Sequence, residues 1–193
     1  MKEIANSGER ILLEKETPMM IARHFCAYRF AESHAINKSL LDIGCGEGYG
    51  SYFLSASAKR VVGIDYDKEI IDYAKNKYCK DNLTFCAINV KELSSLKDRF
   101  DLICAFQVIE HLRDTGSILG FIKELLCDNG LFICSTPNRL DASPNSATPL
   151  NKFHVKEYLS DEFKGLLEQH FSRVDIFGLK RGGELNFYRR LKK

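Results

Sequence analysis

The feature that most constrains the fold is a glycine-rich run, Leu40-Leu41-Asp42-Ile43-Gly44-Cys45-Gly46-Glu47-Gly48-Tyr49-Gly50-Ser51. A short apolar stretch ends in an acid, breaks into alternating glycines and resumes with helix-compatible residues. This pattern predicts a buried strand, a tight turn and a helix. Glycines permit positive φ and let a ligand lie against the main chain, and the first helical turn adds unpaired N–H donors. The run therefore predicts a ligand-binding turn.

The spacing of the glycines separates this turn from two common nucleotide motifs. Dinucleotide sites show G-x-G-x-x-G, but Tyr49 stands where the third glycine belongs. The phosphate loop requires a Gly-Lys-Ser/Thr sequence, which does not follow. The run resembles motif I, D-x-G-x-G-x-G, of the class I S-adenosylmethionine-dependent methyltransferases, whose fixed positions are filled by Asp42, Gly44, Gly46 and Gly48. The alternative is a glycine-rich turn that binds nothing.

A second apolar run, residues 60–65, predicts a strand that ends in Asp65. Nucleoside-binding α/β folds keep an acid about 20 residues after the glycine turn, because a carboxylate at this strand tip can accept both ribose hydroxyls. The role of helix N-cap suits Asp67 better than Asp65. The resemblance implies that Cys45 and Tyr66 also contribute to the cofactor site.

Two further strand ends are expected at the same crevice. Residues 82–87 predict a third strand, and Asn89 and Val90 follow it where the family commonly has Asp-Ala. That aspartate usually accepts the adenine amino group. Asn89 keeps an acceptor in its amide oxygen but loses the charge. Residues 99–106 predict a fourth strand, which places Gln107 beyond its carboxyl end, where ligands of open α/β sheets bind.

The alternation of strands and helices predicts a doubly wound α/β fold. The resemblance implies a seven-stranded, mostly parallel sheet with an antiparallel last strand. The chain of 193 residues suits a single domain over 1–193, with an N-terminal lid or helical segment over 1–36. The remaining elements expected are helices over 18–34 (N-cap Thr17), 67–78, 115–126 and 160–171 (N-cap Ser160), strands over 131–136, 174–179 and 185–188, an Asn129-Gly130 turn, and a hairpin at Arg181-Gly182-Gly183.

The segment after the fourth strand, Gln107-Val108-Ile109-Glu110-His111-Leu112, is similar to the E-H-L motif of ubiquinone-type small-molecule methyltransferases. A hydroxyl acceptor must lose a proton during methyl transfer, and histidine is the natural base near neutral pH. His111 and His154 are therefore the candidate catalytic residues. The alternative for His111 is a hydrogen bond to nearby backbone, and Glu110 is interpreted as structural.

Other segments resemble a bacterial and archaeal subgroup associated with sugar or cell-surface glycan methylation. They are Gly8-Glu9-Arg10, residues 28–31, and Ser135-Thr136-Pro137-Asn138-Arg139 with Phe153-His154-Val155 downstream. The chain departs from the subgroup at Lys152, where a proline is usual, and in the first helix at Arg23 and Ala27.

The long loop over 137–152 is expected to contribute to acceptor binding. We expect Asn138, Arg139 and His154 to bind the acceptor, with loop hydrogen bonding as the alternative for the first two. Arg10 would approach the methionine carboxylate if the N-terminus folds over the pocket.

Composition narrows the setting. A hydrophobic share of 45%, a charged share of 28% and a net charge of +2 are those of an ordinary globular protein. We expect no membrane insertion and no secretion signal. Seven cysteines, an odd number without C-x-x-C spacing, favour the cytoplasm and argue against a metal site. The basic C-terminus, from Lys180 to Lys193, is interpreted as solvated, so nucleic acid is not an expected partner.

The sequence thus predicts a metal-independent transfer of a methyl group from S-adenosyl-L-methionine, leaving S-adenosyl-L-homocysteine, to a small polar acceptor, an oxygen of a sugar-like molecule. One alternative is an RNA or ribosomal-protein methyltransferase. The basic C-terminus favours it, and the lack of an appended RNA-binding module and of an Asn-Pro-Pro-Tyr motif disfavours it. Another alternative is a non-catalytic S-adenosylmethionine-binding protein. The sequence leaves the oligomeric state open.

Overall fold

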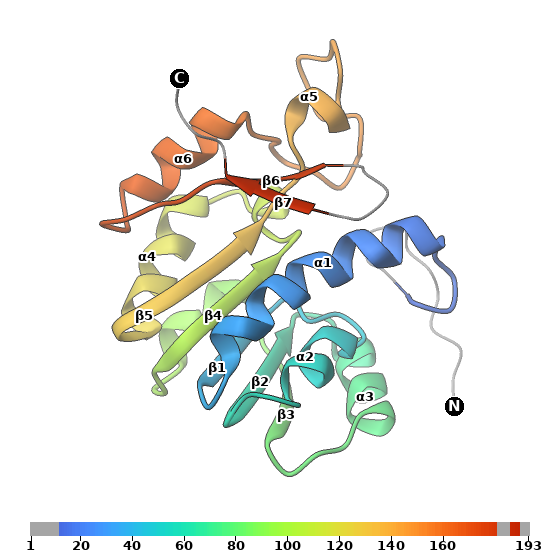
Figure 1. Cartoon of the computed structure of the whole chain (residues 1–193), viewed down its shortest axis with the longest axis vertical. Helices are drawn as coiled ribbons and strands as arrows, with labels where there is room; N and C mark the ends of the chain where they lie inside the picture. The colour runs from blue at the N-terminus through green and yellow to red at the C-terminus, as the bar shows by residue number, and fades with distance from the viewer. Residues whose placement is uncertain (1–11, 181–185, 190–193) are drawn as a thin grey trace.

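The core of the fold is a parallel sheet with the strand order β3-β2-β1-β4-β5 (Figure 1). The computed structural model describes residues 12–180 and 186–189. All neighbouring strands of this sheet are parallel, and the order reverses between β1 and β4. Crevices open at such switch points. The strands are β1 (Ser39–Ile43), β2 (Arg60–Asp65), β3 (Leu83–Ala87), β4 (Phe100–Phe106) and β5 (Leu126–Ser135).

Helices cover both faces of this sheet, as the doubly wound class requires (Figure 1). Successive residues of β1 point to opposite faces: Leu40 packs with α1 and α2, and Leu41 packs with α4 and α6. The sequence therefore reads as continuously apolar strands because both faces are buried. The helices are α1 (Pro18–Ala35), α2 (Tyr49–Leu54), α3 (Lys68–Lys77), α4 (Thr115–Leu125), α5 (Arg139–Ala142) and α6 (Ser160–Glu168), with 3₁₀ helices η1 (Val90–Ser95) and η2 (Ile109–His111).

Two predicted helix caps are confirmed. Thr17 Oγ1 accepts a hydrogen bond from Met20 N at 3.3 Å, and Asp67 Oδ1 accepts from Glu69 N at 2.8 Å. The prediction for Ser160 is wrong, because Ser160 is the first helical residue of α6. The start of that helix is held by Glu162, whose Oε2 accepts from Leu159 N at 2.9 Å.

The fifth strand begins earlier than expected. The predicted Asn129-Gly130 turn lies inside β5, where Phe100 pairs with Leu126 but Leu102 pairs with Leu131. The extra residues form a bulge, and Asn129 takes a positive φ of 61° within it. Asparagine tolerates this conformation better than most residues. The predicted turn is therefore wrong, and the Asn-Gly pair marks an irregularity within the strand.

The expectation of one seven-stranded sheet requires correction. In the described part of the chain the main sheet has five strands, and β6 (Phe177–Lys180) pairs antiparallel with β7 (Asn186–Arg189) in a separate two-stranded sheet. The two strands satisfy part of each other's backbone hydrogen bonding locally. The sequence pattern predicts a hairpin but does not determine which strand the hairpin pairs with, so it could not determine the order of strands in the sheet.

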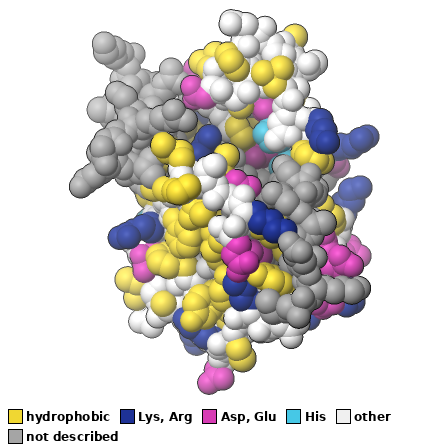
Figure 2. All heavy atoms as spheres, turned by 90° about the vertical axis from the view of Figure 1, so that its right-hand side faces the viewer, with side chains coloured by type: hydrophobic (Ala, Val, Ile, Leu, Met, Phe, Trp, Pro, Cys, Tyr) yellow, Lys and Arg dark blue, Asp and Glu magenta, His cyan; other side chains and the backbone are white. Residues whose placement is uncertain are grey.

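The surface adds two observations. None of the described helices is both long and apolar enough to cross a membrane. On the face shown in Figure 2, hydrophobic side chains gather over the middle of the molecule, and histidine atoms are visible beneath the upper lobe. Arg10 and the side chains of the basic C-terminus lie outside the described residues.

Candidate active site at the carboxyl edge of the sheet

The glycine run forms a turn pinned to the neighbouring strand. Gly44, Gly46 and Gly48 have positive φ values of 71°, 53° and 90°. Gly44 N and Cys45 N both donate to Ile64 O, at 2.8 and 3.0 Å. Only glycine adopts such backbone freely, so this sequence can leave β1 sharply and enter α2 beside the tip of β2.

The three glycines differ in what surrounds them. A Cβ on Gly48 would lie 2.7 Å from the Phe85 ring, and a Cβ on Gly44 would lie 2.5 Å from Val108 Cγ2. A Cβ on Gly46 would meet nothing within 4 Å. Gly48 is therefore required by internal packing, and Gly44 by the turn that follows β4. Gly46 borders open space, as expected of main chain that faces a ligand.

Asp65 lies at the tip of β2 and joins the two strand ends. Its Oδ2 accepts from Gly46 N at 3.1 Å and its Oδ1 accepts from Asp67 N at 3.0 Å. The side chain is 9% exposed. Carboxylate oxygens can each accept more than one hydrogen bond, so these contacts are compatible with ribose binding. Tyr66, which follows, is 55% exposed and presents an aromatic ring at this edge.

Asp42 lies under the glycine turn, in the core. Its carboxylate accepts from Ser51 Oγ at 2.6 Å and from Tyr28 OH at 3.2 Å. Burial raises the pKa of Asp42 to about 7, although both hydrogen bonds lower it. Because the side chain is fully buried, it acts on a ligand only by holding β1, α1 and α2 together. The side chain of Cys45, 2% exposed, likewise points into the core.

Asn89 is engaged within its own segment. It caps η1, with Oδ1 accepting from Lys91 N at 3.0 Å, while Asn89 N donates to Glu92 Oε2 at 3.0 Å. Val90 is the first residue of η1, and its half-buried side chain packs on the core. The amide oxygen predicted to meet adenine therefore already accepts one internal donor.

Gln107 ends β4 with a positive φ of 58°. This conformation is unusual for a residue other than glycine and is often found at functional sites. Gln107 N donates to Ser135 O at 2.9 Å, and its Nε2 donates to Ser135 Oγ at 3.2 Å. These bonds tie the tips of β4 and β5 and fix the turn that carries His111.

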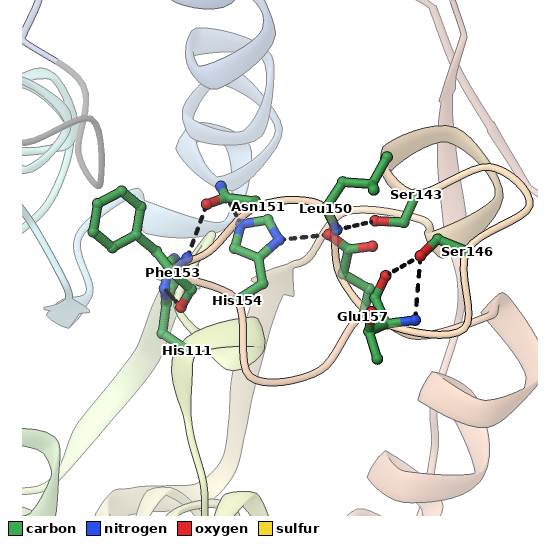
Figure 3. A network of polar contacts seen from close by, with 9 residues as sticks. His111, Ser143, Ser146, Leu150, Asn151, Phe153, His154 and Glu157 are labelled. Atoms are coloured by element: carbon green, nitrogen blue, oxygen red, sulfur yellow. Dashed lines mark hydrogen bonds and ion pairs between the residues drawn. The ribbon is translucent and has the colours of Figure 1, made fainter.

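The fold brings the two candidate histidines together, although they are far apart in the sequence. The rings of His111 and His154 lie 5.1 Å apart and nearly perpendicular. His111 Nδ1 is 2.9 Å from Phe153 O, and His154 Nδ1 is 2.6 Å from Glu157 Oε1 (Figure 3). The backbone contact expected as the alternative for His111 is thus present, beside the second histidine.

The hydrogen bonds around Asn151 assign the protonation of these rings. Asn151 Oδ1 accepts from Phe153 N at 3.0 Å, so its Nδ2 is the atom 3.0 Å from His154 Nε2. The amide donates, so His154 Nε2 is an acceptor and its Nδ1 carries the proton toward Glu157. Phe153 O only accepts, so His111 Nδ1 also carries a proton, and in the neutral form of that ring the lone pair is on Nε2.

Two buried carboxyls adjoin the histidines. The main-chain oxygen of Glu110 accepts from Val155 N at 2.7 Å, which supports its structural interpretation. Its carboxyl, on a residue 1% exposed, has no hydrogen-bond partner of good geometry. Burial raises its pKa to about 7, although the nearby Thr136 hydroxyl and the Glu110 main chain lower it. Glu157, 2% exposed, was missed by the sequence reasoning. The only signal for it was its spacing of three residues from His154.

Asn138 and Arg139 are held by neighbouring elements. Asn138 Oδ1 caps α5 by accepting from Leu140 N at 3.2 Å, and Arg139 Nη2 pairs with Glu162 Oε1 at 3.3 Å. These contacts are of the loop-stabilising kind left open from the sequence. The acceptor-binding role of both residues stays a prediction.

The described part of the N-terminal segment lies against the glycine turn. Leu12, 4% exposed, packs in one cluster with Cys45 and Phe85. Leu13 N donates to Glu47 Oε1 at 3.4 Å, and Glu47 is also 3.8 Å from Lys77 Nζ. No role was predicted for Glu47, which anchors this segment to α3.

The strand order, the glycine turn and the acid at the tip of β2 define a nucleoside-binding α/β domain with histidines beside the crevice. The chain matches the family described as "Methyltransferase domain" over residues 34–173. It therefore belongs to the class I S-adenosylmethionine-dependent methyltransferases, and the predicted family is confirmed.

Similar proteins agree with this assignment. A "Probable S-adenosylmethionine-dependent methyltransferase" of Mycolicibacterium smegmatis is 35% identical over 84% of this chain, which spans 63% of that protein. A ubiquinone biosynthesis O-methyltransferase of Rhodopseudomonas palustris is 35% identical over 52% of the chain and 40% of its own length. The fold of the N-methyltransferase NodS of Bradyrhizobium japonicum matches with a TM-score of 0.67 at 17% identity, over 89% of this chain and 94% of that one.

The residues present fit the family's cofactor, S-adenosylmethionine. The open space beside Gly46 accommodates a ligand against bare main chain, and Asp65 offers carboxylate oxygens at the tip of β2. An acid in this position suits the ribose of the adenosyl group.

Proposed function

We propose that this chain methylates a hydroxyl oxygen of a small, sugar-like polar acceptor, with His111 as the general base. The observation that carries the proposal is the contact between Gly44 and Val108, where a Cβ would lie 2.5 Å from the valine methyl. Val108 belongs to the short turn that holds His111. The cofactor turn and the base are therefore packed as one unit.

Cofactor binding is assigned to the residues of four strand tips. Asp65 binds the ribose, the main chain at Gly44 and Gly46 lies against the ligand, and Tyr66 covers it. Asn89 and Val90 contribute to the adenine site, and Gln107 shapes the crevice from β4. S-adenosylmethionine bound here supplies a methyl group attached to a positively charged sulfur. Asp42 and Cys45 support this site from the core.

The second half of the site prepares the acceptor. The tautomer set by Phe153 O leaves the His111 lone pair on Nε2, where it can take a hydroxyl proton. His154, oriented by Glu157 and Asn151, binds the acceptor. Correct alignment of reacting groups can supply ~7–11 kcal/mol of the barrier reduction. The N-terminal segment, docked through Leu12 and Glu47, forms a lid that excludes water.

A hydroxyl acceptor is favoured over an amine for a chemical reason. A hydroxyl is not deprotonated at neutral pH, so its methylation benefits from a positioned base, and the site brings two imidazoles together. The partial similarity to ubiquinone biosynthesis O-methyltransferases supports the same choice.

The test measures S-adenosylhomocysteine formation by the purified chain with a panel of glycosides and polyols. His111→Asn should lower the rate about 10²–10⁴-fold, the usual contribution of a general base, while S-adenosylhomocysteine affinity by calorimetry stays unchanged. His34→Asn, on the exposed end of α1, is the matched control. A His111→Asn enzyme as fast as wild type would refute the role of the base.

A further inference from the structure

The buried polar atoms without a hydrogen bond gather in one place. Within residues 12–180, such side-chain atoms occur on Glu110 (both carboxyl oxygens), Thr136 (Oγ1) and Glu157 (Oε2). Glu110 follows β4 and Thr136 follows β5, and the two are close enough for Thr136 to influence the pKa of Glu110. Leaving such atoms unpaired costs stability, and isolated cases in native proteins call for an explanation. Several at one site indicate that a ligand completes the bonding.

The chemistry of these atoms defines what the ligand brings. Three of the four are carboxyl oxygens, which accept hydrogen bonds when ionised, so the ligand must carry donors. The carboxyl of Glu110 cannot easily withdraw, because its main-chain oxygen is fixed by Val155 N and Lys156 N at 2.7 and 3.2 Å. Burial, and to a smaller extent the nearby Glu157, raises the pKa of Glu110, while its own main chain, the Thr136 hydroxyl and Arg23 of α1 lower it.

The spacing of these groups admits two kinds of ligand, a metal ion or a hydrogen-bond donor such as a hydroxyl. Glu110, His111 and His154 each offer one atom, and these three atoms lie within 4.8 Å of one another. A metal ion would use all three. However, both ring nitrogens of His154 already have partners, Glu157 Oε1 and Asn151 Nδ2, so coordination would break one of these bonds. A hydroxyl that reaches Glu110 would leave both bonds of His154 in place, and only the side chains that cover the buried carboxyl would have to move to admit it.

We propose that Glu110, together with Thr136, binds a second hydroxyl of the acceptor, on the carbon next to the one that is methylated, so that the site selects vicinal diols. The inference rests on the proposed function, because His111 marks the hydroxyl that reacts. Two oxygens on adjacent carbons lie roughly as far apart as hydrogen-bonded oxygens, ~2.8 Å. A diol hydrogen-bonded at both hydroxyls is long enough to bridge the His111 ring and the Glu110 carboxyl, whose ligand atoms lie within 4.8 Å of each other.

The experiment measures binding rather than turnover. Ligand-observed NMR titrations in the presence of saturating S-adenosylhomocysteine compare cis-1,2-cyclohexanediol with cyclohexanol, which lacks the second hydroxyl. The wild-type chain should bind the diol at least tenfold more tightly. Glu110→Gln should reduce this ratio severalfold and Glu110→Met should bring it close to one. Glu124→Gln, at an exposed position on α4, is the matched control and should keep the ratio. A thermal melt of each variant reports its folding.

Three results would overturn the inference: no diol preference in wild type, an unchanged preference in folded Glu110→Gln and Glu110→Met, or a preference that disappears with EDTA and returns with Mg²⁺. The last would show that the carboxyl holds a metal ion. The proposed function is tested separately by the turnover of His111→Asn. The ratio of diol to cyclohexanol affinity does not depend on that test, because it is measured without methyl transfer.

Discussion

The two halves of the crevice are built differently. In the cofactor half, Gly44 N donates to Ile64 O of β2, and Gly46 N donates to the carboxylate of Asp65. The hydrogen bonds of this half are thus made within the protein. In the acceptor half, Glu110 and Thr136 keep buried polar atoms without partners. The cofactor half is therefore complete as a protein structure. We propose that the acceptor half is completed by its ligand and that the choice of acceptor is made there.

The largest expected effect concerns the two buried carboxyls, one under each half. Asp42 and Glu110 both have a folded pKa raised to about 7 by burial. Their unfolded values are lower, so the unfolded state binds fewer protons, and stability falls as the pH rises from about 4 to 7. A shift of about 3 units corresponds to ~4 kcal/mol at most for Asp42. Urea unfolding between pH 5 and 8 should show Asp42→Asn and Glu110→Gln each flattening this dependence. A wild-type chain that is more stable at pH 8 than at pH 5 would contradict it.

The next prediction isolates the cofactor half. Gly46→Val adds a side chain where a Cβ meets nothing, so internal packing is kept but the ligand's approach is blocked. The positive φ adds a strain of ~1–2 kcal/mol. We expect S-adenosylhomocysteine affinity by calorimetry to fall at least 100-fold, about 2.7 kcal/mol at ~1.4 kcal/mol per tenfold change. Gly120→Ala, in open space on α4, should bind normally. Affinity within threefold of wild type would place the ligand elsewhere.

A smaller effect separates two neighbouring acids at the tip of β2. Asp65→Ala removes the carboxylate assigned to the ribose and should weaken S-adenosylhomocysteine binding about 10–30-fold, which is ~1.5–2 kcal/mol and lies at the lower end of what hydrogen bonds to charged groups contribute. Asp67→Ala removes only the cap of α3 and should cost ~1 kcal/mol of stability. If both variants lost the same affinity, the two acids would affect binding only by shaping the loop between β2 and α3, and Asp65 would not contact the ribose.

The smallest effect tests how far the cofactor half depends on α1. Tyr28→Phe removes the hydroxyl that donates to Asp42 at 3.2 Å. We expect a loss of ~1 kcal/mol in the free energy of unfolding, and a further rise in the pKa of Asp42, because that hydrogen bond lowers it. Ser51→Ala removes the shorter bond, at 2.6 Å, and should act in the same direction. If the pH dependence of stability stayed unchanged in both variants, Asp42 would not be the group responsible for it.

Local signals account for what could be predicted. Thr17 and Asp67 were recognised as caps because their hydrogen bonds reach only a few residues along the chain. The glycine turn and Asp65 follow from apolar runs that end in glycine or acid. The antiparallel pairing of the two terminal strands was predicted, and β6 and β7 pair in this way. The bulge in β5 and the separation of this pair from the main sheet were not foreseen, because they depend on which strands meet and not on the composition of either strand.

The sequence by itself determined the class of fold and predicted where the cofactor binds, since strand periods, turn glycines and strand-end acids are read from neighbouring residues. Only the tertiary structure decided that His111 meets His154 and that Glu157 orients the latter. It alone also buried Asp42 and left the carboxyl of Glu110 without a partner. The physical reason is that these contacts close long loops, and their partners are chosen by packing across the sheet rather than by any local pattern.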